Sequence, residues 1–381
     1  MKEHGRIYLD HNATTPPLPE VTTAVARAMT ESWGNPSTLY ASGRQAREVL
    51  NVARTKVAAL IGAADPSELT FTSGGTEGDN LALAGACQAL ANRGDHVITS
   101  ITEHKAVLET CAALEGRGFR VTYLPVDGTG RVHPDAVRRA IRPATILVSL
   151  MLANNEVGTI NPVVEISRVC RDAGVLFHTD AVQGVGKIPV DVGTLGADLL
   201  TLSAHKFGGP RGAGALWSRS GTRILPVLRG GAQEHGLRPG TENVPAIHGF
   251  GAAAELAGRT LAEYARRLRP LRDRLYEHIR RRIPQTRVHG DLVNGLPNVL
   301  NVSFPAWNAE EMVLALDREG IEAGTGSACS TGKTEPSHVL LAMGVPPDEA
   351  AGAIRFSLGR GNTNEDIDTV VNVLARLCGC S

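Results

Sequence analysis

The sequence lacks a net charge, an apolar run of membrane-spanning length and a patterned set of cysteines. Lysine plus arginine number 39 and so do aspartate plus glutamate, which gives no electrostatic footprint for nucleic acid or an anionic membrane. The N-terminus has no apolar core of a signal peptide. Six scattered cysteines in 381 residues make no disulfide framework, which indicates free thiols in a reducing compartment. We therefore expect a cytoplasmic protein with neither a nucleic-acid nor a membrane partner.

The strand pattern predicts an α/β fold. The length is that of about two domains, and 42% hydrophobic with 20% charged residues is typical of a globular protein. Short apolar strands, for example 146–150 and 175–179, alternate with helical segments. This alternation predicts a mostly parallel sheet covered on both faces, in which ligands bind at the carboxyl ends of the strands.

The pattern of the last third of the chain indicates a second domain. A long glycine-rich loop over 230–243 reads as functional, and residues 245–282 carry an apolar stripe at helical spacing. Pro270 is expected to kink or divide that helix. Strand and helix then alternate again. We assign residues 14–257 to a large domain, and residues 1–13 with 258–381 to a smaller α+β domain.

The most informative lysine is Lys206. An apolar strand over 199–202 runs into Ser203, Ala204, His205 and Lys206, and a glycine-rich turn follows. Most lysines near strand ends are solvated surface groups. A lysine whose surroundings lower its pKa can instead form a Schiff base with pyridoxal phosphate, in which case Ser203 and His205 would stand beside it as phosphate ligands.

A second stretch fits a phosphate group. The strand 69–72 leads through Ser73, Gly74, Gly75 and Thr76 into a helical segment, so backbone N–H groups and a hydroxyl lie at a helix N-terminus, where the dipole favours an anion. By itself the stretch is better explained as a helix cap on a tight turn.

The cysteines fall into three groups. Cys329 lies in a loop of small residues and is predicted to be accessible, whereas Cys87, Cys111 and Cys170 lie on apolar helical patterns and are predicted to be packing residues. Cys378 and Cys380 form a Cys-Gly-Cys tail. That tail is either merely exposed or takes part in metal binding or sulfur relay, and no other metal ligand set is predicted.

Taken in order, these stretches closely resemble the cysteine desulfurases, in the branch of the nitrogen-fixation and iron–sulfur-cluster enzymes. The resemblance covers nearly the whole chain. It is carried by the motifs at 8–16, 71–77, 103–104, 154–156, 178–183, 203–206, 238–241, 326–329 and 355–360.

The resemblance implies a fold-type I pyridoxal phosphate enzyme with a seven-stranded type of sheet, and a homodimer. It further implies L-cysteine as substrate, L-alanine and an enzyme persulfide as products, and a sulfur acceptor such as an iron–sulfur scaffold protein. The chain stops soon after Arg376, so we expect it to lack the C-terminal extension with which some relatives dock a scaffold.

The resemblance also assigns roles to residues. Lys206 would hold the cofactor and take a proton from the substrate, His104 would stack on the ring, and the Cys329 thiolate would attack the substrate sulfur. Arg355 would hold the substrate carboxylate, with Asn155 bonding the ring oxygen or the substrate. The other implied cofactor contacts are Gly75, Thr76, Ser203 and His205 at the phosphate, Thr241 from the second subunit, Asp180 at the ring nitrogen and Gln183 at the ring oxygen.

The sequence departs from the family pattern at three places. Gly324 and Thr325 stand where this branch commonly has two serines, Arg211 replaces a usual lysine, and Gly78 with Asp79 follows the phosphate stretch. We expect these changes to tune activity. Two rival interpretations are an aminotransferase or selenocysteine lyase of the same fold, which would have no need of Cys329, and a cofactor-binding regulatory or scaffold protein without catalysis.

Overall fold

Alternating side chains of the strands build a sheet with two buried faces. The structure, a computed structural model, describes residues 5–304, 307–325 and 336–380. Its main sheet has the order β2-β8-β7-β6-β5-β3-β4, and only β8 runs antiparallel to its neighbours. The strands are β2 (Leu69–Thr72), β3 (His96–Ser100), β4 (Arg120–Leu124), β5 (Thr145–Ser149), β6 (Leu176–Asp180), β7 (Leu199–Ser203) and β8 (Gly214–Ser218).

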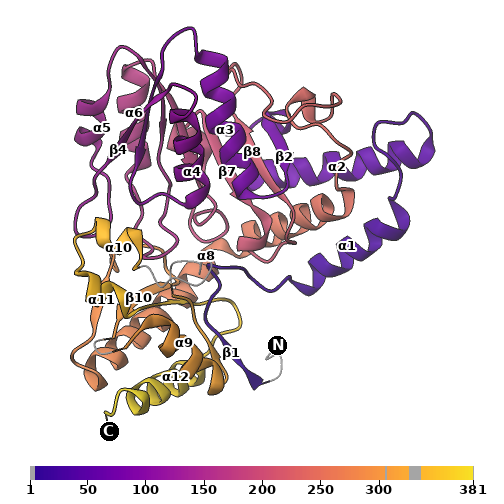
Figure 1. The fold of residues 1–381 in the computed structure, drawn as a ribbon. Helices are drawn as coiled ribbons and strands as arrows, with labels where there is room; N and C mark the ends of the chain where they lie inside the picture. The colour runs from indigo at the N-terminus through magenta and orange to yellow at the C-terminus, as the bar shows by residue number, and fades with distance from the viewer. Residues whose placement is uncertain (1–4, 305–306, 326–335, 381) are drawn as a thin grey trace.

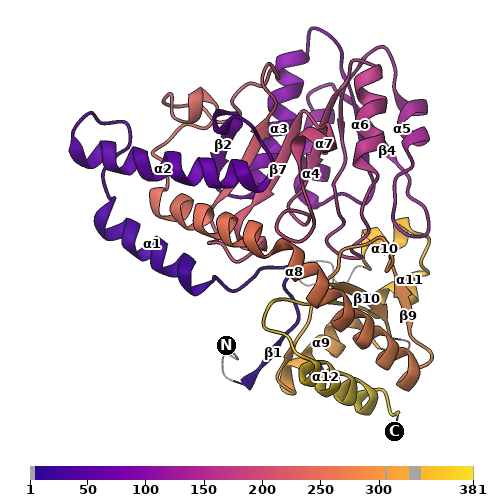
Figure 2. The same cartoon turned by 180° about the vertical axis from the view of Figure 1, so that it is seen from behind.

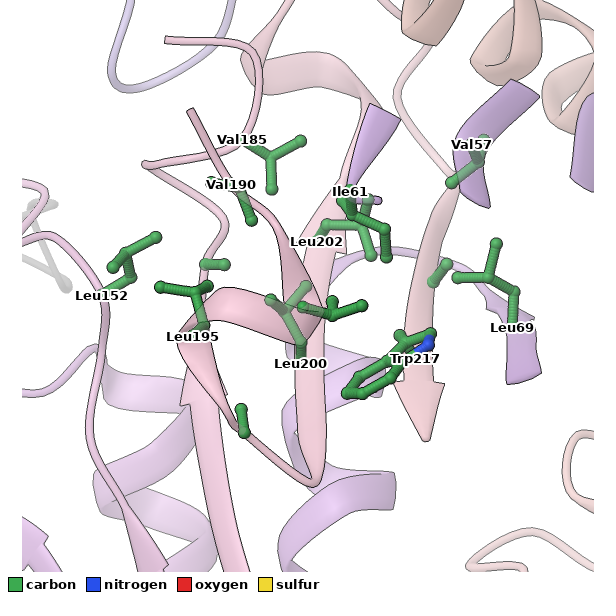
Figure 3. Packing of buried hydrophobic residues seen from close by; sticks show 14 of the residues in the cluster. Val57, Ile61, Leu69, Leu152, Val185, Val190, Leu195, Leu200, Leu202 and Trp217 are labelled. Atoms are coloured by element: carbon green, nitrogen blue, oxygen red, sulfur yellow. The ribbon is translucent and has the colours of Figure 1, made fainter. Parts of the chain in front are cut away.

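Helices cover both faces of this sheet (Figure 1). Because successive strand residues point to opposite faces, Leu199 packs in the cluster under α3 and α4, while Leu200 and Leu202 pack in the opposite cluster. Figure 3 shows this opposite cluster, the large one, in which Leu200, Leu202 and Trp217 face Val57 and Ile61. The helices of this part are α1 (Pro19–Glu31), α2 (Ala41–Leu60), α3 (Gly75–Leu90), α4 (Lys105–Glu115), α5 (Pro134–Ala140), α6 (Val163–Asp172) and α7 (Val192–Leu195), with short turns η2 (Pro66–Glu68), η3 (Ala204–Lys206) and η4 (Glu234–Gly236).

The predicted α/β architecture is therefore correct, with small shifts. Two strands begin one residue from their predicted start, at Thr145 and Leu176. The three cysteines predicted to be packing residues, Cys87, Cys111 and Cys170, are all buried. No helix of the described chain is both long and apolar enough to cross a membrane.

A second hydrophobic cluster lies around a three-stranded antiparallel sheet of order β12-β10-β9. The N-terminal strand β1 pairs in parallel with β11 and buries Leu9 in the same cluster. The elements here are β1 (Ile7–Tyr8), β9 (Arg287–His289), β10 (Val299–Ser303), α9 (Ala309–Arg318), β11 (Ile321–Glu322), α10 (His338–Ala342), α11 (Pro347–Ala351), β12 (Ala353–Ser357) and α12 (Asn364–Leu377).

The long helix α8 (Val244–Arg282) connects the two clusters, as Figure 2 shows from behind. Its first half places Phe250 and Ala257 in the large cluster, and its second half places Leu268 and Leu275 in the smaller one. We propose on this basis that the domain boundary lies near residue 257. Pro270 does not divide the helix, contrary to one of the outcomes we expected. Its side chain is exposed, so water can bond the carbonyl that loses its N–H partner.

The burial of α8 leads to a stability prediction. Leu275 is fully buried in the second cluster, so Leu275→Ala should lower the free energy of unfolding by about 2–5 kcal/mol, because it leaves a cavity. The matched control is Leu314→Ala on α9, where the leucine is 58% exposed and the change should stay within about 0.5 kcal/mol. Urea unfolding followed by circular dichroism measures both, and equal losses would contradict the described packing.

Candidate active site

The parallel strands place their polar ends at one edge of the sheet. Strand β6 ends at Asp180, and the neighbouring β7 ends at Ser203 and continues directly into η3, which contains Lys206. His104, which follows β3, and Lys206 are the two charged side chains that act most on Asp180. The structure thus brings together three residues that are far apart in the sequence, as the pattern of strand ends predicted.

Lys206 is held by the N-terminal segment. Its Nζ donates to the carbonyl oxygens of Asn12 at 2.7 Å and Ala13 at 2.9 Å. Burial and the positive charge of Arg355 lower the pKa of Lys206, the carboxylates of Asp180 and Asp10 oppose the change, and the net pKa is about 8. At pH 7 roughly a tenth of this amine is therefore uncharged, far more than of an ordinary lysine, and the uncharged form is the nucleophile.

Asp180 is a buried carboxylate beside two basic side chains, His104 and Lys206. Burial raises its pKa, while His104, the Val182 N–H and Lys206 counteract the rise. Val182 N donates to Asp180 Oδ1 at 2.9 Å and so directs the carboxylate. Below it, buried Asp79 lies with one carboxylate oxygen 3.7 Å from His178 Nε2. Asp180 suits an ion pair with a protonated ring nitrogen, which would compensate its desolvation.

His104 has a defined tautomer. It precedes α4, and its Nδ1 accepts a hydrogen bond from Ala106 N at 3.1 Å. An imidazole nitrogen that accepts cannot carry the proton, so in the neutral ring the proton lies on Nε2. The side chain is solvent exposed in the isolated chain, which leaves its ring free to cover a bound group.

The predicted phosphate ligands fit such a group. Ser203 Oγ is buried, and no residue of the described chain bonds it. Ser203 also lies next to Gly75, since a Cβ added to Gly75 would lie 3.8 Å from Ser203 Cβ. The same Cβ would approach Val182 Cγ2 to 2.8 Å, so only glycine lets the start of α3 come this close. Thr76 is exposed on the first turn of α3. A buried hydroxyl without a partner beside a helix N-terminus is what a phosphate would satisfy.

His205 lies at the same edge of the sheet and is held by the N-terminal segment. Its Nδ1 is 3.0 Å from Thr14 Oγ1, and its carbonyl accepts from Thr15 N at 2.9 Å. Burial lowers the pKa of His205 to about 4, with Lys206 adding to the effect. The imidazole is therefore neutral at physiological pH, and it would meet an anion as a hydrogen-bonding group.

Arg355 forms the base of the site. It is buried on β12 of the smaller sheet, where Nη2 donates to Asp10 Oδ1 at 2.5 Å and Nη1 to the Asn155 carbonyl at 3.2 Å. Its buried Nε has no partner within the described residues. A guanidinium with an unused N–H beside a reactive lysine suits a substrate carboxylate.

The segment that leads to Cys329 starts beside this arginine. Gly324 exchanges backbone hydrogen bonds with Arg355, N to O at 3.0 Å and O to N at 2.7 Å. A Cβ at Gly324 would lie 2.8 Å from Asp10 Oδ1 and 2.9 Å from Arg355 Nη2. The glycine that departs from the family pattern therefore lies directly against the Arg355–Asp10 ion pair. Cys329 itself is outside the described residues.

Another predicted residue, Thr241, lies elsewhere. Thr241 is exposed in this chain, which leaves it accessible to a second subunit.

The C-terminal tail carries two of the cysteines. There, Cys378 is half-buried against the smaller hydrophobic cluster. Burial raises the pKa of the Cys378 thiol to about 11, and Cys380 adds to the rise. A thiol of that pKa is a poor nucleophile. Within the described ranges, no group of His, Cys, Asp or Glu is arranged to hold a metal.

Sequence reasoning assigned no role to three residues that the site uses. Asn12 and Asp10 belong to a motif that carried the resemblance, but their contacts with Lys206 and Arg355 depend on the fold. Lys187 is 1% exposed and donates to Asn12 Oδ1 at 2.8 Å and to Gln183 Oε1. Its four-residue spacing from Gln183 was the available signal, because a helical turn brings such residues together.

Comparison with known proteins agrees with this geometry. Residues 7–370 match the family model described as aminotransferase class-V. Cysteine desulfurase IscS of Methanosarcina thermophila is 50% identical over 375 residues, which are 98% of this chain and 92% of that protein.

Solved structures agree as well. A NifS-like protein superposes with a TM-score of 0.92 at 38% identity, covering 98% of this chain and 99% of the other. A structure of SspA in complex with cysteine has a TM-score of 0.79 at 35% identity and covers 92% and 98%. The fold, the identity and the coverage together show that this chain belongs to the class-V aminotransferase family and, within it, to the cysteine desulfurases.

Proposed function

We propose that this chain converts L-cysteine to L-alanine with pyridoxal phosphate, leaves the sulfur as a persulfide on Cys329, and passes it to an acceptor such as an iron–sulfur scaffold protein. The observation that carries the proposal is that Lys206 and Asp180, at one edge of the main sheet, lie near Arg355 of the smaller sheet, in a chain of the cysteine desulfurase family. The complex of the related SspA with cysteine supports the choice of substrate.

The residues divide the work of binding the cofactor. The phosphate would be bound by Gly75, Thr76, Ser203 and His205. Asp180 would pair with the ring nitrogen, and Gln183 and Asn155 would form hydrogen bonds with the ring oxygen. When bound, pyridoxal phosphate supplies an electron sink that makes the Cα proton of cysteine removable. The His104 imidazole, which carries its proton on Nε2, would stack on the cofactor ring.

The substrate steps fall to Arg355, Lys206 and Cys329. Arg355 binds the α-carboxylate and fixes Cα near Lys206, whose uncharged amine takes the Cα proton. The Cys329 thiolate then attacks the substrate sulfur. A sulfur–sulfur bond forms, the Cβ–S bond breaks with its electron pair left on the carbon fragment, and that fragment takes up protons to become alanine.

We also propose a homodimer, in which Thr241 of each chain completes the phosphate site of the other. Large apolar side chains are exposed at the corner between α1 and α2, which is unusual for a free surface; they are Met29, Trp33, Leu39 and Tyr40. The loop before Thr241 lies against the same corner, because Gln233 and Glu234 line a cavity of about 330 Å³ together with Pro36 and Ser37. Burial of this corner by a second copy would bring Thr241 into an interface.

Two further points complete the proposal. We place the protein in the cytoplasm, because a persulfide-forming thiol and the free cysteines of the described chain suit a reducing compartment.

The test of the function as a whole is incubation of the purified protein with L-cysteine and a reductant. Alanine and sulfide should appear in equal amounts, and alanine formed without sulfide would contradict a desulfurase.

The lowered pKa of Lys206 predicts how cofactor attachment depends on pH. Because only the uncharged amine attacks an aldehyde, the rate at which apoenzyme gains borohydride-trappable pyridoxal phosphate should rise with pH and reach half its maximum near the pKa of about 8. Nα-acetyl-lysine in solution is the reference, with a midpoint about two pH units higher. Stopped-flow absorbance measures both, and equal midpoints would contradict the described environment of Lys206.

Loss of the carboxylate clamp should act mainly on KM. Arg355→Ala removes a charge-assisted contact made in both the ground state and the transition state, so KM for cysteine should rise about 10- to 100-fold with a smaller change in kcat. Arg287→Ala is the matched control, since Arg287 lies on the same small sheet and forms an exposed ion pair with Glu349. An unchanged KM in Arg355→Ala would assign the carboxylate to another group.

Cys329 separates desulfurase from aminotransferase chemistry. Cys329→Ala should still bind pyridoxal phosphate, yet its sulfide release should fall by about 10²-fold or more, because the nucleophile is gone. Peptide mass spectrometry of the wild type after a cysteine pulse should find the extra sulfur on Cys329. Cys378→Ala and Cys380→Ala are the controls and should release sulfide normally. A first persulfide on the tail would refute the assignment.

A further inference from the structure

A closed group of hydrogen bonds lies directly behind the site. Lys187 Nζ donates to Asn12 Oδ1 at 2.8 Å and to Gln183 Oε1, and Gln183 Nε2 donates to the Asn12 carbonyl at 2.9 Å. All three side chains are buried, with Lys187 and Asn12 each 1% exposed. No carboxylate of the described chain forms an ion pair with Lys187. A buried lysine without an acidic partner is unfavourable unless its hydrogens are bonded, and here two amide oxygens each accept one of them.

These bonds specify which way the Gln183 amide points. An amine donates, so Oε1 must face Lys187, and the NH₂ end must then face the Asn12 carbonyl. The reversed amide would set donor against donor at Lys187 and oxygen against oxygen at Asn12. In the observed orientation Nε2 keeps a second hydrogen, for which the described residues provide no acceptor. That hydrogen is the one Gln183 can offer to the cofactor.

Asn12 extends the arrangement to two further residues of the site. Its carbonyl also accepts from Lys206 Nζ at 2.7 Å, and its Nδ2 donates to the Asn155 carbonyl at 3.0 Å. Because Lys187 and Asn298 both donate to Asn12 Oδ1, the second at 3.3 Å, this amide too has only one favourable orientation. Loss of the Lys187 amine would therefore alter the position of Gln183 directly. It would alter the positions of Lys206 and Asn155 indirectly, because both bond Asn12.

We propose that Lys187 is a positioning residue, which orients the amides of Gln183 and Asn12 and thereby aligns Gln183, Asn155 and Lys206 for the cofactor. This inference rests on the proposed function, since it concerns the alignment of that same site. Lys187 itself touches neither substrate nor cofactor; it acts through the two amides.

The test compares Lys187→Met with wild type in the full-length holoenzyme. Methionine keeps the length of the side chain and removes the donor. The loss of a buried lysine offsets only part of the cost of leaving two amide oxygens without a donor, so the protein should still fold, with a lowered thermal midpoint. The affinity of apoenzyme for pyridoxal phosphate should weaken about tenfold, the visible band of the bound cofactor should shift, and kcat should drop at least about tenfold with KM within threefold. Lys56→Met, at a surface pair with Glu255, is the matched control and should behave as wild type.

A double-mutant cycle shows whether Lys187 acts through Gln183. Gln183→Leu should weaken cofactor binding and shift the visible band in the same direction, and adding Lys187→Met should then have a smaller effect than in the wild type, because one of the two amides that it orients is gone. Fully additive losses would overturn the proposal, and so would a Lys187→Met enzyme with wild-type band, affinity and kcat. If Lys187→Met cannot be purified, Lys187→Gln takes its place, with smaller losses expected and the same additivity criterion.

Failure of the proposed function would give a different result from failure of the positioning role. In that case the wild-type protein itself would bind no pyridoxal phosphate or release no sulfide. An active wild type that Lys187→Met matches in every readout would instead leave the function intact and refute only the positioning role.

Discussion

The contact between the N-terminal segment and the ends of the parallel strands is the constraint on which the site depends. Leu9 is packed in the smaller hydrophobic cluster, and three residues later Asn12 accepts from Lys206. Thr15 continues the contact, since its N–H donates to the His205 carbonyl at 2.9 Å and its Oγ1 accepts from Gly208 N at 2.6 Å. The reactive lysine is thus held between the two hydrophobic clusters, and their relative placement sets its position.

The site carries charges that a stable core would avoid. Lys206, Asp180, Lys187 and Arg355 are largely withdrawn from water, and burial is the first cause of the shifted pKa of each of the first three. Such desolvation is unfavourable, and it persists where surrounding packing is strong enough to impose it. That packing comes from the doubly covered sheet and from α8, whose two halves belong to different clusters.

Substrate binding and sulfur transfer share a structural base. Arg355 bonds Asp10 and the Asn155 carbonyl through its side chain and Gly324 through its backbone. The chain that continues toward Cys329 is therefore paired, at Gly324, with the residue proposed to hold the substrate carboxylate. This backbone pairing between Gly324 and Arg355 ties the starting point of the cysteine segment to the place where the substrate carboxylate would bind.

The sequence by itself determined the α/β class, the strand ends that carry Asp180 and Lys206, and the family, because strand periodicity and ordered motifs are local patterns. It assigned Gln183 and Arg355 through the resemblance alone. Only the tertiary structure decided that Lys187 lies behind Gln183, that Asp10 pairs with Arg355, and that Pro270 leaves α8 undivided. The reason is physical: these outcomes depend on which distant segments meet and which groups lose their water, and neither local periodicity nor propensity encodes such long-range contacts.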